Sequence, residues 1–280
     1  MKETVYKIFR ECFPEYPMPF DIFFDVLTYD ECMTLTVAEE DIITGVAVIS
    51  GNYIRLLCVR PEYQGKGYGR RLLEMCEEKI KADGYGEVVL GGLYGLFQGA
   101  VTTEADWNRK SNPFFEKCGY AASNGCFEMK MEMKDFNISQ IPIQIPEDIT
   151  FGYYTDSDRS GLQEAIRDVD EEWVQYFSDT DQVFCAFRGG KIASFAIVGD
   201  HDRNILSKEG ANIGTIGCVG TVHSERRRGS GLAMVAMATE ELKKAGCDTV
   251  FIHHTTLDNW YGKLGYYKFM WYWLGKKALR

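Results

Sequence analysis

One stretch of 33 residues occurs twice in this chain, and the second copy aligns with the first without a gap at an offset of 162 positions. The first copy, CVRPEYQGKGYGRRLLEMCEEKIKADGYGEVVL, begins at Cys58, and the second, GTVHSERRRGSGLAMVAMATEELKKAGCDTVFI, begins at Gly220. Three glycines coincide in the two copies: Gly67 with Gly229, Gly69 with Gly231, and Gly84 with Gly246. Self-similarity at a fixed offset indicates a repeated structural unit. The 280 residues are therefore predicted to form two copies of one domain.

A second match follows the first at a different offset. The segment NPFFEKCGY, which ends at Tyr120, resembles the segment DNWYGKLGYY of the second half. In this alignment Tyr261 corresponds to Phe115, at an offset of 146 positions. The first half therefore contains a 16-residue insertion, near GGLYGLFQGAVTTEADW. Long glycine-containing loops often close over a substrate cleft. A structural wrap that packs Tyr94 and Phe97 against the domain is the other interpretation.

Each half alternates helical and strand patterns. Apolar residues at helical spacing predict helices over 2–12, 20–32 and 157–169, and alternating or continuous apolar runs predict strands over 33–38, 44–50, 53–59, 181–187, 191–198 and 212–222. Both copies of the repeat predict the same order of elements: a strand, a glycine-rich turn, a helix, a glycine that ends the helix, and a second strand. The predicted fold class is α/β (α+β), with a mixed twisted sheet flanked by helices in each domain. The segment 135–148 contains two prolines and no helical periodicity, so it is interpreted as a linker or an edge segment. The domains are placed at 1–137 and 148–280.

Composition excludes several classes of protein. The chain has 31 basic and 41 acidic side chains, a net charge of −10, and therefore lacks the basic surface of a nucleic-acid binder. No apolar run approaches the length of about 20 residues needed to span a membrane. Nine cysteines without a CxxC pair indicate reduced thiols, and the charged N-terminus does not resemble a signal peptide. We expect a cytoplasmic protein with no nucleic-acid or membrane partner.

The two glycine turns are candidate anion sites. A strand, a glycine-rich turn and a helix place several backbone N–H groups at a helix N-terminus, where the helix dipole also attracts negative charge. The first turn is QGKGYG, with Lys66 and Arg70 nearby, and the second is RRRGSG. Neither matches the dinucleotide GxGxxG or the Walker GxxxxGK[ST] spacing.

The spacing [QR]-x-x-G-x-[GA] after a strand ending VRPEY resembles the GNAT superfamily of acetyl-CoA-dependent N-acyltransferases, and the resemblance extends through both halves. It implies two tandem GNAT-like domains with acetyl-CoA as co-substrate. It also implies that the loop binds the pyrophosphate of coenzyme A, and that a backbone amide of the preceding strand, over 56–59 or 218–222, polarises the thioester carbonyl. The residues implied to bind coenzyme A are Leu57, Val59, Gln64, Gly65, Lys66, Gly67, Tyr68, Gly69, Arg70, Asn108, Val222, Arg226, Arg227, Arg228, Gly229, Ser230, Gly231, Leu232 and His254.

The late family motif, roughly N-x-x-A-x-x-[FL]-Y-E-K-x-G-[FY], is divided between the halves. The first half has Asn108 at the coenzyme-contacting position but Phe115 where the family has its general-acid tyrosine. The second half has Tyr261 at that position but His254 in place of the asparagine. Because a phenol can protonate a departing thiolate and a phenyl ring cannot, we expect the C-terminal half to carry the chemistry.

The resemblance therefore implies an N-acetyltransferase that acts on a primary amine of a small molecule or a peptide N-terminus. The alternatives are a non-catalytic sensor or scaffold that binds coenzyme A or acyl-CoA, and an acyltransferase with a longer acyl or an aminoacyl-tRNA donor. Acidity argues against tRNA. The general base is left open among Glu225, His223, His253, His254 and proton loss through water, with His223 and His253 the two named as candidates. No metal is expected, since His253, His254 and Asp258 lack a third ligand at recognisable spacing.

Overall fold

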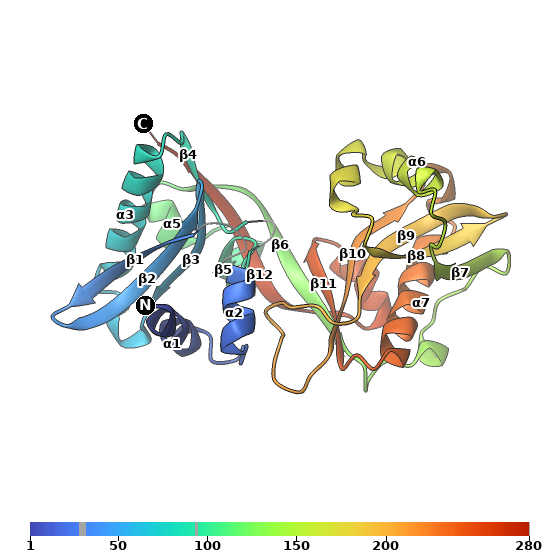
Figure 1. Ribbon diagram of the computed structural model, residues 1–280, viewed down its shortest axis with the longest axis horizontal. Helices are drawn as coiled ribbons and strands as arrows, with labels where there is room; N and C mark the ends of the chain where they lie inside the picture. The colour runs from blue at the N-terminus through green and yellow to red at the C-terminus, as the bar shows by residue number, and fades with distance from the viewer. Residues whose placement is uncertain (28–31, 93–94, 280) are drawn as a thin grey trace. The chain divides into compact units, whose positions relative to one another are not determined.

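The computed structural model describes residues 1–27, 32–92 and 95–279, and it divides the chain into two compact units (Figure 1). The first unit contains Met1–Phe127, Arg203–Gly210 and Met270–Arg280, and the second contains Glu128–Asp202 and Ala211–Phe269. Across the described ranges, none of the helices combines the length and the apolar character that crossing a bilayer requires.

The first unit is a mixed sheet with helices packed on it. Its strands are β1 (Met33–Glu39), β2 (Ile42–Ser50), β3 (Tyr53–Val59), β4 (Glu87–Leu90) and β5 (Ala100–Thr102). Its helices are α1 (Lys2–Cys12), α2 (Phe20–Leu27), α3 (Tyr68–Ala82), α4 (Glu104–Asn108) and α5 (Pro113–Lys117), with a 3-10 turn at Pro61–Tyr63. The sheet order is β1-β2-β3-β4-β12, where β12 is Tyr267–Ala278. The pair β3–β4 is parallel and the other pairs are antiparallel.

Helix α3 buries the apolar stripe that its sequence spacing predicts. Leu72, Leu73, Cys76 and Ile80 are all buried and belong to one hydrophobic cluster with residues of β2, β3 and β4. The helix ends before Gly84, which adopts a φ of 92°. This conformation is accessible to glycine at little cost and is typical of a helix C-terminus. The local sequence therefore fixes both the buried face and the end of this helix.

The second unit repeats the arrangement. Its strands are β7 (Ile149–Tyr153), β8 (Gln182–Arg188), β9 (Lys191–Gly199), β10 (Ile213–Thr221) and β11 (Thr249–Thr255). Its helices are α6 (Ser160–Val169), α7 (Ser230–Lys244) and α8 (Asp258–Tyr261), with 3-10 turns at Ile138–Gln140, Glu171–Tyr176, His223–Glu225 and Gly262–Leu264. The strand order is β6-β11-β10-β9-β8-β7, where β6 is Ala121–Glu132. The predicted fold class, a mixed sheet flanked by helices and built twice, is confirmed.

The compact units do not follow chain order, because each includes a strand segment from the other sequence half. The part of β12 from Met270 onward, red in Figure 1, belongs to the first unit, where Lys276–Ala278 pair with β4. Residues 128–132 of β6 belong to the second unit, where β6 lies next to β11. A strand satisfies its backbone hydrogen bonds equally well with a partner from either half. The boundaries 1–137 and 148–280 therefore stay a proposal about the sequence repeat, and the compact units differ from them.

The insertion of the first half packs as a structural wrap where it is described. Phe97 is buried, with its ring centroid 5.0 Å from that of Phe13. Strand β5 pairs with β12 through Trp271 and Thr102. Tyr94, the other residue that this interpretation packs against the domain, lies outside the described residues. So do residues 28–31 of the helix predicted over 20–32.

Candidate functional site

A cavity of about 390 Å³ lies in the second unit, at the glycine turn that precedes α7. The end of β10 lines it with Val219, Gly220 and Thr221. The turn and the start of α7 contribute Arg226, Arg227, Gly229, Gly231 and Leu232, and Tyr261 completes the lining together with Trp260. The structure thus brings together the predicted anion loop and the predicted general acid, which are some 30 positions apart in the sequence.

The cavity lies where β10 and β11 diverge. The two strands pair in parallel from Ile213 and Thr249 to Ile216 and Ile252. Beyond this point the register of β10 against β9 shifts between Gly217 and Gly220, and Cys218 adopts a φ of 46°. Such a bulge bends a strand and re-aims its backbone groups. It therefore separates β10 from β11 at the position where the family resemblance expects the acyl group.

The turn itself has a backbone suited to holding an anion. Arg227 and Gly229 both adopt positive φ, at 63° and 84°. Gly229 is the N-cap of α7 and no side chain caps the helix. The amides of the first helical turn are consequently available to a ligand, and the positive end of the helix dipole lies among them.

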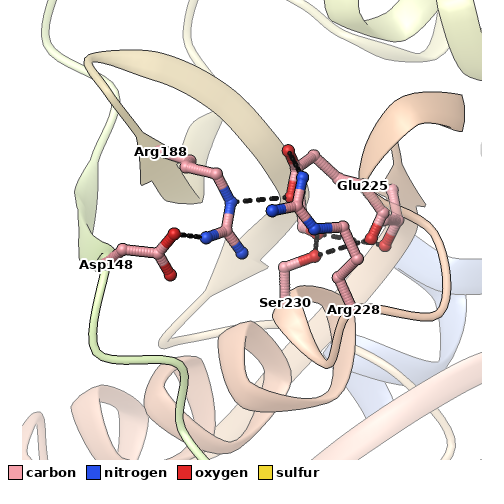
Figure 2. A network of polar contacts seen from close by, with 7 residues as sticks. Asp148, Arg188, Glu225, Arg228 and Ser230 are labelled. Atoms are coloured by element: carbon pink, nitrogen blue, oxygen red, sulfur yellow. Dashed lines mark hydrogen bonds and ion pairs between the residues drawn. The ribbon is translucent and has the colours of Figure 1, made fainter.

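Two of the three arginines in the turn face the cavity, and the third holds the turn together. Glu225, which is 9% exposed, accepts hydrogen bonds from Arg188 Nε and Arg228 Nη1, both at 2.9 Å. Figure 2 shows Arg188 between Glu225 and Asp148, with which it forms a second ion pair. Ser230 Oγ donates to the carbonyl of Glu225 at 3.3 Å. The network fixes the turn and leaves Glu225 in ion pairs, although it was a candidate base.

Tyr261 is 5% exposed and keeps its proton. Burial raises the pKa of its phenol, and the neighbouring Cys218 raises it further. The ring of Trp260 meets it edge-on, with the centroids 4.8 Å apart. A buried phenol with a raised pKa is protonated at neutral pH, so it can act as a donor and not as a base.

Two other predicted residues of this half have different surroundings. The amide of Val222 donates to the carbonyl of Ala193 at 3.1 Å, so it is already used within the sheet. His254, at the end of β11, is not among the described residues that line this cavity. Burial and the neighbouring His253 lower its pKa.

The first unit repeats the turn with the same backbone. Gly65 and Gly67 adopt φ values of 76° and 92°, and Gly67 is the N-cap of α3, again with no side-chain cap. Gln64 Nε2 donates to the carbonyl of Val59 at 3.0 Å, and Lys66 lies 4.8 Å from the ring centroid of Tyr63. The first helical turn is therefore open to an anion here as well.

The remainder of the predicted first-half site is dispersed. Phe115 is partly buried and packs against the core, with its ring centroid 5.5 Å from that of Tyr120 and 6.3 Å from that of Trp273. Asn108 is exposed at the end of α4, and Leu57 pairs with Ala47 inside the sheet. Arg70 lines a separate cavity of about 420 Å³ beside α3 and α5. Tyr68 and Gly69 begin α3, where the ring of Phe114 approaches the glycine.

The sequence reasoning missed one buried acid, Glu128 on β6. Its side chain is 1% exposed, and its Oε2 accepts from Nδ1 of His253 at 3.1 Å and from the amide of His254 at 3.0 Å. The residues are 125 and 126 positions apart, and no local pattern connects them. Within the described part of the chain, no group of three or more potential metal ligands was found.

Comparison with known proteins agrees with this geometry. The Acetyltransferase (GNAT) family matches residues 2–120 and again 148–266. No curated protein matches the chain.

Several solved structures share the fold. A GCN5-related glucosamine N-acetyltransferase region of a fungal multi-domain GH3 β-N-acetylglucosaminidase superposes with a TM-score of 0.77 at 22% identity, over 98% of this chain and 36% of that one. The chain thus spans about a third of that protein. A GCN5-related N-acetyltransferase from Sphaerobacter thermophilus superposes with a TM-score of 0.70 at 16% identity, over 99% of this chain and 92% of that one. A tandem GNAT protein from the clavulanic acid biosynthesis pathway superposes with a TM-score of 0.68 at 10% identity, over 100% of this chain and 95% of that one. With both halves matched, the chain belongs to the GNAT acetyltransferase family and contains two GNAT domains in tandem.

Proposed function

We propose that the protein is an N-acetyltransferase that moves an acetyl group from acetyl-CoA to a primary amine of a small molecule or a peptide N-terminus. Acyl transfer is the chemistry that the GNAT fold supports. The observation that carries the proposal is the cavity of the second unit, which is lined by an uncapped helix N-terminus, two arginines and a protonated tyrosine.

The residues around the cavity fit coenzyme A. Its pyrophosphate matches the amides of the first turn of α7 together with Arg226 and Arg227. The diverging strands β10 and β11 offer backbone donors beside Cys218, where a thioester oxygen would gain from a fixed hydrogen bond. Acetyl-CoA would supply the acetyl group as an activated thioester.

Tyr261 has the role of general acid in this proposal. Its hydroxyl proton passes to the sulfur as the C–S bond breaks, which avoids release of a free thiolate. The first unit has a phenyl ring at the equivalent position, so its turn is proposed to bind coenzyme A without this proton donor.

The test is release of free thiol from acetyl-CoA in the presence of a panel of amines. The panel includes polyamines, amino-terminal peptides and amino sugars. Glucosamine is among them because the fungal region with this fold is described as a glucosamine N-acetyltransferase. The net charge of −10 favours cationic acceptors. Thiol release that depends on one class of amine supports the proposal, whereas binding of coenzyme A without turnover on any amine supports the non-catalytic sensor instead.

A further inference from the structure

His253 and Glu128 form an acid–imidazole pair on the second unit's sheet. Both carboxylate oxygens of Glu128 lie 3.1 Å from Nδ1 of His253, and Oε2 meets hydrogen-bond geometry. The carboxylate is 1% exposed, whereas the imidazole is 39% exposed. The part of the pair that solvent or a ligand can reach is therefore the imidazole.

The strand register shows which way His253 points. Val250 pairs with Gly214, and a side chain at Gly214 would contact Leu242 of α7. Because side chains alternate along a strand, Val250 and Ile252 face α7 and His253 faces the opposite side. The ring of Phe251 is 5.4 Å from that of His253, which agrees with a shared face.

Tyr261 lies on the α7 side of the same sheet. Its ring centroid is 6.2 Å from that of Tyr266, whose hydroxyl is 2.7 Å from Thr239 of α7. His253 is the first residue of β11 after the paired segment ends at Ile252. It therefore lies where the strands begin to diverge, across the sheet from the proposed proton donor.

The hydrogen bond to Glu128 also fixes the imidazole chemistry. A carboxylate accepts a hydrogen bond from Nδ1–H, so the proton of a neutral ring stays on Nδ1 and the lone pair is on Nε2. The same carboxylate stabilises the charged ring after it has taken up a proton, as in other acid–imidazole pairs. Nε2 is thus the basic atom, and it is on the ring that is partly exposed.

We propose that His253 is the general base for the acceptor amine and that Glu128, contributed by the N-terminal sequence repeat, is its positioning residue. This inference rests on the proposed function. One proton of the acceptor ammonium passes to Nε2, and the amine nitrogen then bonds to the acetyl carbon as the C–S bond breaks. The sulfur takes the proton of Tyr261. The second proton that the nitrogen loses returns to the tyrosinate through solvent, and His253 releases its own proton to solvent.

The charges around the imidazole favour this role. Burial lowers the pKa of His253, but the charge and the hydrogen bond of Glu128 raise it, with a smaller contribution from Asp202, and the net shift is upward. Lys130 and Glu132, which follow on β6, pair with each other at 3.1 Å. His254, the next residue on β11, adopts a φ of 49°, so the regular alternation of side chains ends there. A raised pKa makes His253 a stronger base toward an alkylammonium group. Because the imidazole must be neutral to accept a proton, activity falls as the pH drops through that pKa.

His223, the other candidate, begins the 3-10 turn that follows β10. Its amide and its Nδ1 both contact Asp168, at 2.6 and 3.2 Å. It precedes the arginines of the phosphate turn and follows Cys218 by five residues. It therefore lies next to the arginines of the turn and beyond Ile216, where the pairing of β10 with β11 ends.

The experiment compares the steady-state kinetics of three variants of the full chain: His253→Gln, Glu128→Gln and His201→Gln. Each is assayed with acetyl-CoA and the amine of the panel that gives the fastest thiol release. His201 is an exposed histidine and is the matched control. We expect His253→Gln to lower kcat by about 10²-fold, as for loss of a general base, with coenzyme A affinity unchanged by calorimetry. Glu128→Gln keeps an acceptor oxygen for the amide of His254 and removes the charge. We expect it to move the acidic limb of the kcat/KM profile to lower pH by about one unit.

A second measurement separates catalysis from folding. The chain has four histidines, so the imidazole of His253 can be assigned and titrated by NMR in the unaltered protein and in Glu128→Gln. Free imidazole is expected to restore turnover to His253→Ala. Unchanged kcat and an unchanged pH profile in His253→Gln overturn the inference and leave the proposed function intact. Absence of turnover in the unaltered protein overturns the proposed function, and the base role with it.

Discussion

Arg227 adopts the left-handed backbone conformation of Gly65, its counterpart 162 residues earlier, with φ values of 63° and 76°. A residue with a Cβ atom rarely adopts this conformation, because the Cβ approaches the following carbonyl. The conformation is therefore imposed by the turn. Backbone conformations of this kind occur in turns whose successive amides bind an anion.

Two substitutions at Arg227 separate backbone from charge. Arg227→Gly removes the charge and suits the conformation, so we expect coenzyme A to bind more weakly by about 1–2 kcal/mol, that is about 5- to 30-fold. Arg227→Val removes the same charge and adds a β-branched side chain, which costs about 1–2 kcal/mol more. Calorimetric titration measures both affinities. Equal affinities for the two variants would contradict an imposed left-handed turn.

Tyr261→Phe tests the general acid. We expect kcat to fall by about 10²-fold or more, with coenzyme A affinity and the thermal midpoint nearly unchanged, because only one hydroxyl oxygen is lost. Tyr266→Phe is the matched control. It loses the hydrogen bond to Thr239 and about 1 kcal/mol of folding free energy, but kcat is expected to persist. Steady-state thiol release on both variants decides the point, and an unchanged kcat in Tyr261→Phe excludes the acid role.

The ion pair between Arg188 and Glu225 is expected to stabilise both the fold and the turn. Arg188→Met leaves the carboxylate with Arg228, which is 51% exposed, as its remaining cation. We expect the free energy of unfolding to fall by about 1–3 kcal/mol and coenzyme A binding to weaken by about 1 kcal/mol, that is about fivefold.

The control for this ion pair is Arg203→Met. Arg203 and Asp25 are both more than half exposed, so their ion pair is expected to contribute less than about 1 kcal/mol. Denaturant titrations of the two variants give the comparison. Equal losses would show that the buried network is no more stabilising than a surface pair.

Local sequence predicts the repeat, the two turns and their helices well. The strand Tyr53–Val59 and the helix Lys2–Cys12 begin and end where their apolar patterns do. The position of Tyr261 near the second turn also follows from the family resemblance, because both motifs belong to one coenzyme site, although their spacing differs by 16 residues between the halves. These features depend on neighbouring residues and on the internal alignment.

The exchange of strands and the contribution of Glu128 could not be predicted in this way. A strand pairs with a partner chosen by the tertiary fold, and nothing within Ala121–Glu132 distinguishes pairing with the first half from pairing with the second. A lone glutamate in a strand is usually a solvent-facing residue. Its burial against His253 depends on contacts more than 100 positions away.

Gly67→Val and Gly229→Val test which unit carries the chemistry. Both glycines are helix N-caps in the left-handed region, with φ values of 92° and 84°. A Cβ at Gly67 meets nothing within 4 Å, and at Gly229 the nearest atoms are at an ordinary 3.7 Å, so the Cβ itself fits at both positions and the strain comes from the left-handed backbone. We expect Gly229→Val to lower kcat/KM at least tenfold by distorting the turn beside Tyr261. Gly67→Val is expected to keep kcat/KM within about twofold, because the first unit lacks the tyrosine.

Calorimetry counts the coenzyme A sites that each variant retains. Loss of turnover in Gly67→Val with full activity in Gly229→Val would assign catalysis to the first unit.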